Sequence, residues 1–339
     1  MNQDLLLSSA KALNDDEAGG HGNRWGVFDD DVPALMGRWL GVAVNDAEVS
    51  GFGMGDQGAL AQLVAQGEPS AFALLHTGQA RGEGHAGLMA LIYQDPGGPD
   101  REPRNALFSA FPFFGNGVEV LAEVVQIGVF PNSLEARLRL GLSSGAVVFA
   151  FDTGFVQSRA VYRAGEPYRF VLSALAYDMG PAQSLDHVID DEDEIRRFHA
   201  RNAWAEVHGG WTKEDEAASL AAWQPQSPED LEPIHINMGQ MAILLPSSAG
   251  PADDAQFVGE VVQITPRAVR VLDVDFWRVD TVVIRADEEV VIPIYVAEHL
   301  FENDWRPEVG QYVTGSLWLQ AYATERMDDP AKLVTVSER

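Results

Sequence analysis

The feature that most constrains the fold of this chain is an internal repeat in its second half. The segment Glu123-Val-Val-Gln-Ile127 recurs further along the chain as Glu260-Val-Val-Gln-Ile264. A match this short can arise by chance, so the test is whether later landmarks keep the same order. If they do, the chain carries one pattern twice and must form the same strands and turns twice.

The landmarks downstream of each copy keep that order. A β-rich run and then an apolar strand follow in both, at 134–142 and 147–151 in the first copy and at 269–274 and 290–294 in the second. The separation of Gly165 from Tyr177 equals that of Gly310 from Tyr322. The alternation of a strand with one buried face follows in both copies, at Leu172, Ala174 and Ala176 and at Leu317, Leu319 and Ala321.

Each copy therefore has the pattern of about five strands, with an irregular insertion before the last strand and little helix. This pattern is typical of a small closed barrel and resembles an OB-like barrel, while an SH3-like barrel or a small sandwich would have much the same strand list. We expect a mainly β fold with an α+β N-terminal part, in which two tandem small β-barrels (OB-like or SH3-like) are joined by a helical connector.

The expected domains are a small α+β domain, a first β-barrel repeat, a helical acidic connector, a second β-barrel repeat and a C-terminal tail, at 1–102, 103–180, 181–233, 234–327 and 328–339. One further strand per repeat is expected, at 107–114 and 241–245. In the N-terminal part, apolar periodicity predicts helices at 32–40 and 60–64 and strands at 72–75 and 88–93. The Pro- and Gly-rich stretch 95–104 is predicted to be a linker into the first barrel.

The connector carries helix signals. Ile195, Phe198, Trp204 and Val207 have the spacing of an amphipathic helix, which the pair at 209–210, both glycine, would end. The acidic run 190–194 suits the start of that helix, because carboxylates complement the helix dipole there. A calcium loop would need glycine where Ile195 stands. Thr212 with Asp215 resembles a capping box that opens a second helix through Trp223.

Charge and composition narrow the classes of function. The chain has 51 Asp and Glu against 23 Lys and Arg, a formal net charge of −28. This charge disfavours nucleic acid and acidic membrane surfaces as partners and favours a protein partner with a basic face. The chain has no cysteine, which excludes disulfides, thiolate nucleophiles and cysteine-bearing metal sites. No apolar run reaches the length of a membrane span, and we expect a cytoplasmic location.

Two short motifs share their spacing with sites of chemistry, and each is better explained as a turn. Gly53 to Gly58 has the glycine spacing of a dinucleotide fingerprint, but neither the preceding buried strand nor the later acidic residue is present. Gly141 to Gly145 has the spacing of a nucleophile elbow, but strand-like runs flank it on both sides and predict a hairpin loop. No cofactor and no metal site are expected.

The candidates for ligand or partner binding are aromatic side chains of the second repeat, namely Trp277, Tyr295, Trp305, Trp318 and Tyr322. Packing in the core or between domains is the alternative for all five. Strand alternation points Trp318 away from Leu317 and Leu319. If those two fill the barrel, Trp318 is exposed or covered by another domain.

The leading hypothesis is a noncatalytic binding or scaffold protein with duplicated β-barrel modules, which docks a protein partner through an acidic surface. This includes an inhibitor-like or immunity-like role. The alternative is an enzyme whose site lies in the N-terminal domain around His76 and His85, two histidines that flank a Gly-rich turn. The sequence names no reaction class for that alternative.

Overall fold

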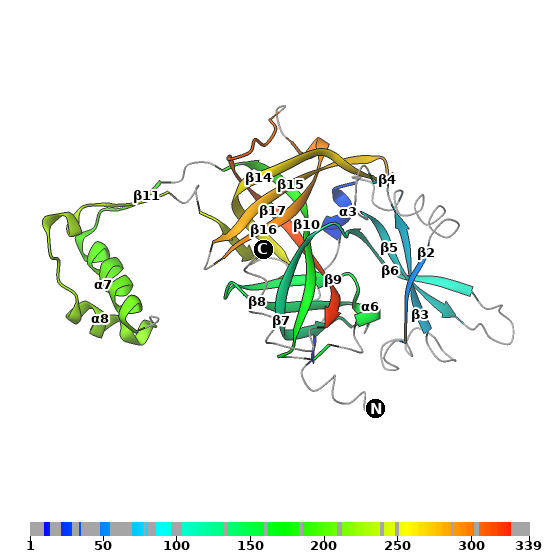
Figure 1. Cartoon of the computed structure of the whole chain (residues 1–339), viewed down its shortest axis with the longest axis horizontal. Coiled ribbons are helices and arrows are strands. Elements are labelled where there is room, and N and C mark those ends of the chain that lie inside the picture. The colour runs from blue at the N-terminus through cyan, green and yellow to red at the C-terminus, as the bar shows by residue number, and fades with distance from the viewer. Residues whose placement is uncertain are drawn as a thin grey trace. The chain divides into compact units, whose positions relative to one another are not determined.

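The fold is mainly β in the computed structural model of the chain (Figure 1). Contacts divide the chain into two units, which we call the sheet unit (Met1–Pro181 with Ala242–Arg339) and the inserted unit (Ala182–Met241). The structure describes residues 10–13, 22–28, 34, 48–54, 70–77, 79–80, 86–95, 104–131, 134–158, 162–163, 165–182, 186–208, 212–237, 241–247, 251–285, 288–301 and 305–326.

The sheet unit contains a four-stranded antiparallel sheet in the order β2-β3-β5-β6, formed by Glu48–Met54, Ser70–Thr77, Ala86–Asp95 and Arg104–Phe114. The strands predicted at 72–75 and 88–93 are confirmed as parts of β3 and β5. The strand predicted at 107–114 forms as β6, but it pairs with β5 and not with the first repeat. The predicted linker 95–104 therefore joins two paired strands. Apart from residue 34, the helices predicted at 32–40 and 60–64 lie outside the described residues.

The larger sheet has eleven strands among the described residues, two of which are the short β1 (Ala10–Ala12) and β4 (Gln79–Ala80). Its first half consists of β7 (Val118–Val129), β8 (Ala136–Leu142), β9 (Val147–Asp152) and β10 (Pro167–Pro181). β7 pairs with β8 and with β10, and β8 pairs with β9, all antiparallel. The predicted hairpin loop between β8 and β9 is confirmed. Gly145 has the left-handed φ of 81° that this turn requires.

The second half repeats these pairings with β14 (Asp254–Val271), β15 (Val274–Arg285), β16 (Glu289–Ala297) and β17 (Tyr312–Arg326). β14 pairs with β15 and with β17, and β15 pairs with β16, again antiparallel. The strand predicted at 241–245 forms as β13 (Ile243–Pro246) and pairs with β14. Register shifts also match, at 124/126 on β7 and at 261/263 on β14.

The irregular insertion before the last strand forms in both halves, with α6 (Phe155–Ser158) in the first and η4 (Glu298–Leu300) in the second. Each insertion ends at a glycine with left-handed φ, 78° at Gly165 and 85° at Gly310. The Gly165 N–H donates to the Val124 carbonyl (2.9 Å), as the Gly310 N–H donates to the Val261 carbonyl (2.7 Å). The same turn therefore precedes the last strand of each half.

The two halves meet through their last strands. β10 and β17 pair antiparallel, with Ala174 opposite Leu319, two residues that correspond in the sequence repeat. β17 also pairs with β9, and β10 with β16, both parallel. The described pairings therefore close two five-stranded rings, β7-β8-β9-β17-β10 and β14-β15-β16-β10-β17. Instead of two barrels joined only by a connector, the strands of both halves form one sheet.

Two apolar cores lie on opposite faces of the β10–β17 pair. The first fills the rings and includes Leu172, Leu317 and Leu319. The second lies on the other face and includes Trp318, together with side chains from β5, β6 and the segment that follows α3 (Gly22–Gly26). The predicted direction of Trp318 is confirmed, and its cover comes from the N-terminal part of the chain.

The inserted unit contains α7 (Glu192–His208), η1 (Lys213–Asp215), α8 (Glu216–Ala222) and η2 (Pro228–Leu231). The helix predicted to start at the acidic run is confirmed as α7, and the Asp191 carboxylate accepts the Glu194 N–H at 3.0 Å. The capping box of Thr212 and Asp215 is confirmed.

Near the two ends of the inserted unit, β11 (Asp186–Ile189) and β12 (Ile234–Asn237) pair antiparallel and form a two-stranded sheet.

None of the helices that the structure describes combines the length and hydropathy that a membrane crossing requires.

Candidate functional site

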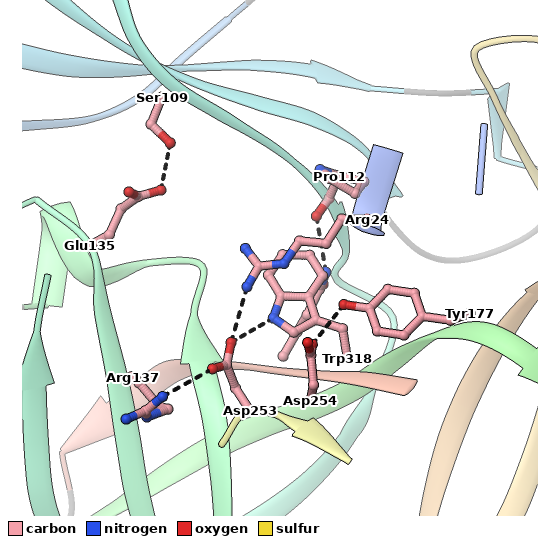
Figure 2. A network of polar contacts seen from close by, with 10 residues as sticks. Arg24, Ser109, Pro112, Glu135, Arg137, Tyr177, Asp253, Asp254 and Trp318 are labelled. Carbon is pink, nitrogen blue, oxygen red and sulfur yellow. Dashed lines mark hydrogen bonds and ion pairs between the residues drawn. The ribbon is translucent and has the colours of Figure 1, made fainter. Parts of the chain in front are cut away.

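The described part of the sheet unit contains a buried polar network around Asp253, in the turn before β14 (Figure 2). The Asp253 carboxylate accepts hydrogen bonds from Arg24 at 3.1 Å and from the Trp318 indole N–H at 2.8 Å. The Arg24 guanidinium lies over the Trp318 ring, 3.5 Å from its centroid. Arg137 on β8 adds an ion pair to Asp253 at 3.6 Å.

Two further pairs surround this network. The Tyr177 hydroxyl on β10 donates to Asp254 at 2.7 Å, and the Ser109 hydroxyl on β6 donates to Glu135 at 2.6 Å. Burial and then the charge of Asp254 raise the pKa of Tyr177, and burial raises the pKa of Asp254. Burial lowers the pKa of the Arg24 guanidinium, and the Asp253 charge opposes that shift.

The network is closed to solvent, which limits what it can do chemically. Arg24 is 1% exposed and Asp253 is 0% exposed. A substrate cannot reach these groups in this conformation. The buried ion pair instead holds the α3 segment against the paired strands β10 and β17. The network is a structural clamp. Sequence reasoning missed it because Arg24 and Asp253 lie far apart in the chain.

The structure separates the five predicted aromatic candidates into three groups. Trp318 belongs to the buried network. Tyr295 and Tyr322 hold the segment before β7, because their hydroxyls donate to the backbone carbonyls of Asn116 (2.9 Å) and Gly115 (2.8 Å), respectively. These three side chains are engaged with the protein itself.

Trp277 and Trp305 form the third group, with Phe301 between them. The ring centroids of Trp277 and Phe301 are 5.4 Å apart, and those of Phe301 and Trp305 are 5.8 Å apart. The Arg306 guanidinium lies 5.0 Å from the Phe301 centroid and 5.7 Å from that of Trp277. The three side chains pack on the core inside the strand rings, and the protein's own cation already occupies their exposed side.

A surface ion-pair cluster on β14 was not predicted, although Glu260 belongs to the repeated segment. Arg285 binds the Glu260 carboxylate and also donates to Glu289 at 2.9 Å. The Tyr312 hydroxyl donates to Glu260 at 3.1 Å. In the first half, Glu123 holds the corresponding position and lies opposite Gly141 on β8 and Pro167 on β10.

The inserted unit concentrates negative charge. It contains 13 Asp and Glu against 4 Arg and Lys, a formal charge of −9. Two of its arginines are already paired within the unit, Arg196 with Glu192 at 2.8 Å and Arg197 with Glu216 at 3.8 Å. The carboxylates therefore dominate its surface.

The inserted unit also has a small core with aromatic side chains at its edge. Among those of its residues whose burial is described, only Ile195, Ala200 and Ser219 are buried. The His199 ring stacks on Trp223 with centroids 5.5 Å apart, and His208 lies against Trp204 at 4.1 Å. Val207 is 77% exposed. A partner that covers these rings would bury apolar surface which the unit leaves half-exposed.

The alternative enzyme site falls largely outside the described residues. His85 lies outside them, and nothing about the side chain of His76 is described, although its backbone is part of β3. The described residues contain no group of His, Asp and Glu side chains that is arranged to hold a metal ion.

Comparison with known proteins adds no relative, since no family model, no curated protein and no solved structure matches this chain.

Proposed function

We propose that this chain is a noncatalytic binding or scaffold protein, built on a duplicated barrel-like strand unit, which docks a protein partner with a basic face. The observation that carries the proposal is the composition of the inserted unit, with a formal charge of −9 and only three buried side chains in its described part. We infer that this unit supplies the acidic docking surface.

The two halves of the large sheet share structural features that the short repeated segment alone would not require, which supports duplication of one strand unit. The halves share the same strand pairings, the same register shift after Val124 and Val261, and the same turn at Gly165 and Gly310. Corresponding residues also face each other at Ala174 and Leu319, as in a two-fold arrangement of one unit. A rigid frame of this kind suits a scaffold, because it holds attached elements without itself needing a reactive group.

Docking by the inserted unit follows from its size and charge. A unit this small buries little apolar surface by itself, so contact with a partner adds burial that its own fold lacks. Its excess of carboxylates attracts a basic surface over a distance set by ionic strength and raises the rate of association. Binding is therefore expected to weaken steeply as salt increases.

The test uses the immobilised full-length chain and a cell lysate, washed at roughly 0.05 M and 0.5 M salt. The wild-type chain should retain a basic protein at low salt and release it at high salt. A triple variant, Asp193→Asn, Glu194→Gln and Glu214→Gln, removes three exposed carboxylates of the inserted unit. This variant should lose the same protein.

The matched control removes three exposed carboxylates of the sheet unit, with Asp273→Asn, Glu288→Gln and Glu308→Gln. Both triple variants change the net charge equally, so only the location of the charge differs. Retention of the same protein by the control is expected. Equal loss in both variants would show a general charge effect, and no retention by the wild type at low salt would end the proposal.

A further inference from the structure

The two halves of the large sheet differ at one surface position, where the second half has an ion pair and the first half does not. Glu260 is bound by Arg285 and by the Tyr312 hydroxyl. Glu123 corresponds to Glu260 in the repeat, yet its neighbours across the sheet are Gly141 and Pro167. Within the part of the chain that the structure describes, the Glu123 carboxylate makes no ion pair and no hydrogen bond.

Two exposed valines lie near Glu123, one on β7 and one on β9. Val125, two positions along β7, is 40% exposed, and Val147 on β9 is 44% exposed. Both flank Gly141, which lies opposite Val147, and a Cβ added at Gly141 would lie 3.3 Å from the Val125 side chain. Gly141 itself places no side chain beside the carboxylate, and the Val125 side chain lies next to it.

The nearby charged groups on this face are already engaged. Glu119 pairs with Arg169 at 3.2 Å, and the Arg139 guanidinium lies 6.0 Å from the centroid of the Phe149 ring. Among the described side chains of β7, Glu123 is therefore the carboxylate whose charge no neighbouring side chain compensates.

We propose that this face, which consists of Glu123, Val125, Gly141, Val147 and Pro167, binds an arginine side chain of a protein partner. The second half provides the template, because Arg285 occupies the equivalent carboxylate there from within the chain. A guanidinium matches a carboxylate with two parallel hydrogen bonds, which an ammonium group cannot do. The two valines favour an apolar residue next to that arginine.

This face lies on the sheet unit, so the proposal goes beyond docking by the inserted unit and either can fail without the other. The probe is the peptide acetyl-valine-arginine-valine-amide, titrated into the full-length chain and followed by the NMR signals of the valine methyl groups. We expect saturable shifts at Val125 and Val147, with a dissociation constant of about 1 mM. The peptide with glutamine in place of arginine should give no saturable shift.

Two variants test the role of the carboxylate. Glu123→Gln should weaken peptide binding at least about 5-fold, while Glu289→Gln, an exposed carboxylate of the second half, should leave it unchanged. Gly141→Arg places an arginine opposite Glu123 and should abolish binding while the chain stays folded. Binding of the arginine peptide to Glu123→Gln as tight as to the wild type, or equal binding of the glutamine peptide, would overturn the proposal.

Discussion

At the scale of single residues, Arg24 is the cation whose loss should matter most for stability. Its removal leaves the Asp253 carboxylate buried, with Arg137 at 3.6 Å as its remaining ion-pair partner among the described residues. We expect Arg24→Leu to lower the free energy of unfolding by roughly 3–5 kcal/mol, because an uncompensated charge would remain in the interior. Urea unfolding followed by tryptophan fluorescence measures this change.

The control for this prediction is the double variant Arg24→Leu with Asp253→Asn. Asparagine keeps an oxygen that can accept the Trp318 indole N–H but carries no charge, so most of the lost stability should return. A single variant within about 1 kcal/mol of the wild type would show that the charge of Asp253 is compensated in another way.

Asp152 at the end of β9 predicts a pH dependence. Burial raises its pKa from 3.8 to about 7, although the nearby Tyr162 hydroxyl and the Gly154 N–H oppose that shift. Between these two pH values the folded carboxyl keeps a proton that the unfolded chain releases. The stability contributed by this group is therefore present at low pH and is lost as pH rises through about 7.

Asp152→Asn removes this titration. The variant should match the wild type near pH 4 and become more stable than it above pH 7, by up to roughly 4 kcal/mol. Urea unfolding at about pH 4, 6 and 8 measures the difference. Glu308→Gln, which removes an exposed carboxylate, is the control for the loss of one negative charge.

At the scale of elements, the turns before β10 and β17 carry a matched pair of predictions. Gly165 and Gly310 both have left-handed φ and donate the same kind of backbone hydrogen bond. Gly165→Ala and Gly310→Ala should each cost roughly 1–2 kcal/mol, because a Cβ disfavours that conformation. Thermal unfolding of the two variants should give similar losses.

Gly180 on β10 is the control for those turns. It has no left-handed φ, and a Cβ added there has no neighbour within 4 Å. Gly180→Ala should stay within about 0.5 kcal/mol of the wild type. Unequal losses at Gly165 and Gly310 would show that the two turns do not bear the same strain.

At the scale of the whole molecule, the shared strands predict that both halves of the large sheet unfold together. Each strand ring contains the last strand of the other half, so β10 and β17 belong to both rings. Leu319 on β17 lies opposite Ala174 on β10, where these two strands pair. We expect Leu319→Ala to lower stability by roughly 2–5 kcal/mol through the cavity it leaves. Hydrogen exchange should then accelerate equally for amides of β8 and of β15.

The inserted unit supplies the contrast for that experiment. Ile195→Ala should accelerate exchange in α7 and α8 and leave β8 and β15 protected, because the two units have separate cores. If Leu319→Ala accelerated exchange in only one half, the rings would be stable without the shared strands.

Local signals were sufficient wherever an element depends on its own residues. The alternation around Leu172 and Leu317, the turn at Gly145 and the capping box at Thr212 were all predicted, since each is set by neighbours within a few positions. The assignment of β6 to the first repeat was wrong, because strand patterns do not name their pairing partners. The described part of the structure tests neither His76 nor His85 as a site.

The amino-acid sequence by itself determined the mainly β composition, the strands of both halves, their turns and the acidic helices, because periodicity and backbone preference act over short distances. It also determined that Trp318 points away from the ring interior. Only the tertiary structure decided that β10 and β17 join the two rings and that Arg24 and Asp253 clamp Trp318. Those contacts are set by packing between segments far apart in the chain, where charge and shape must match in space.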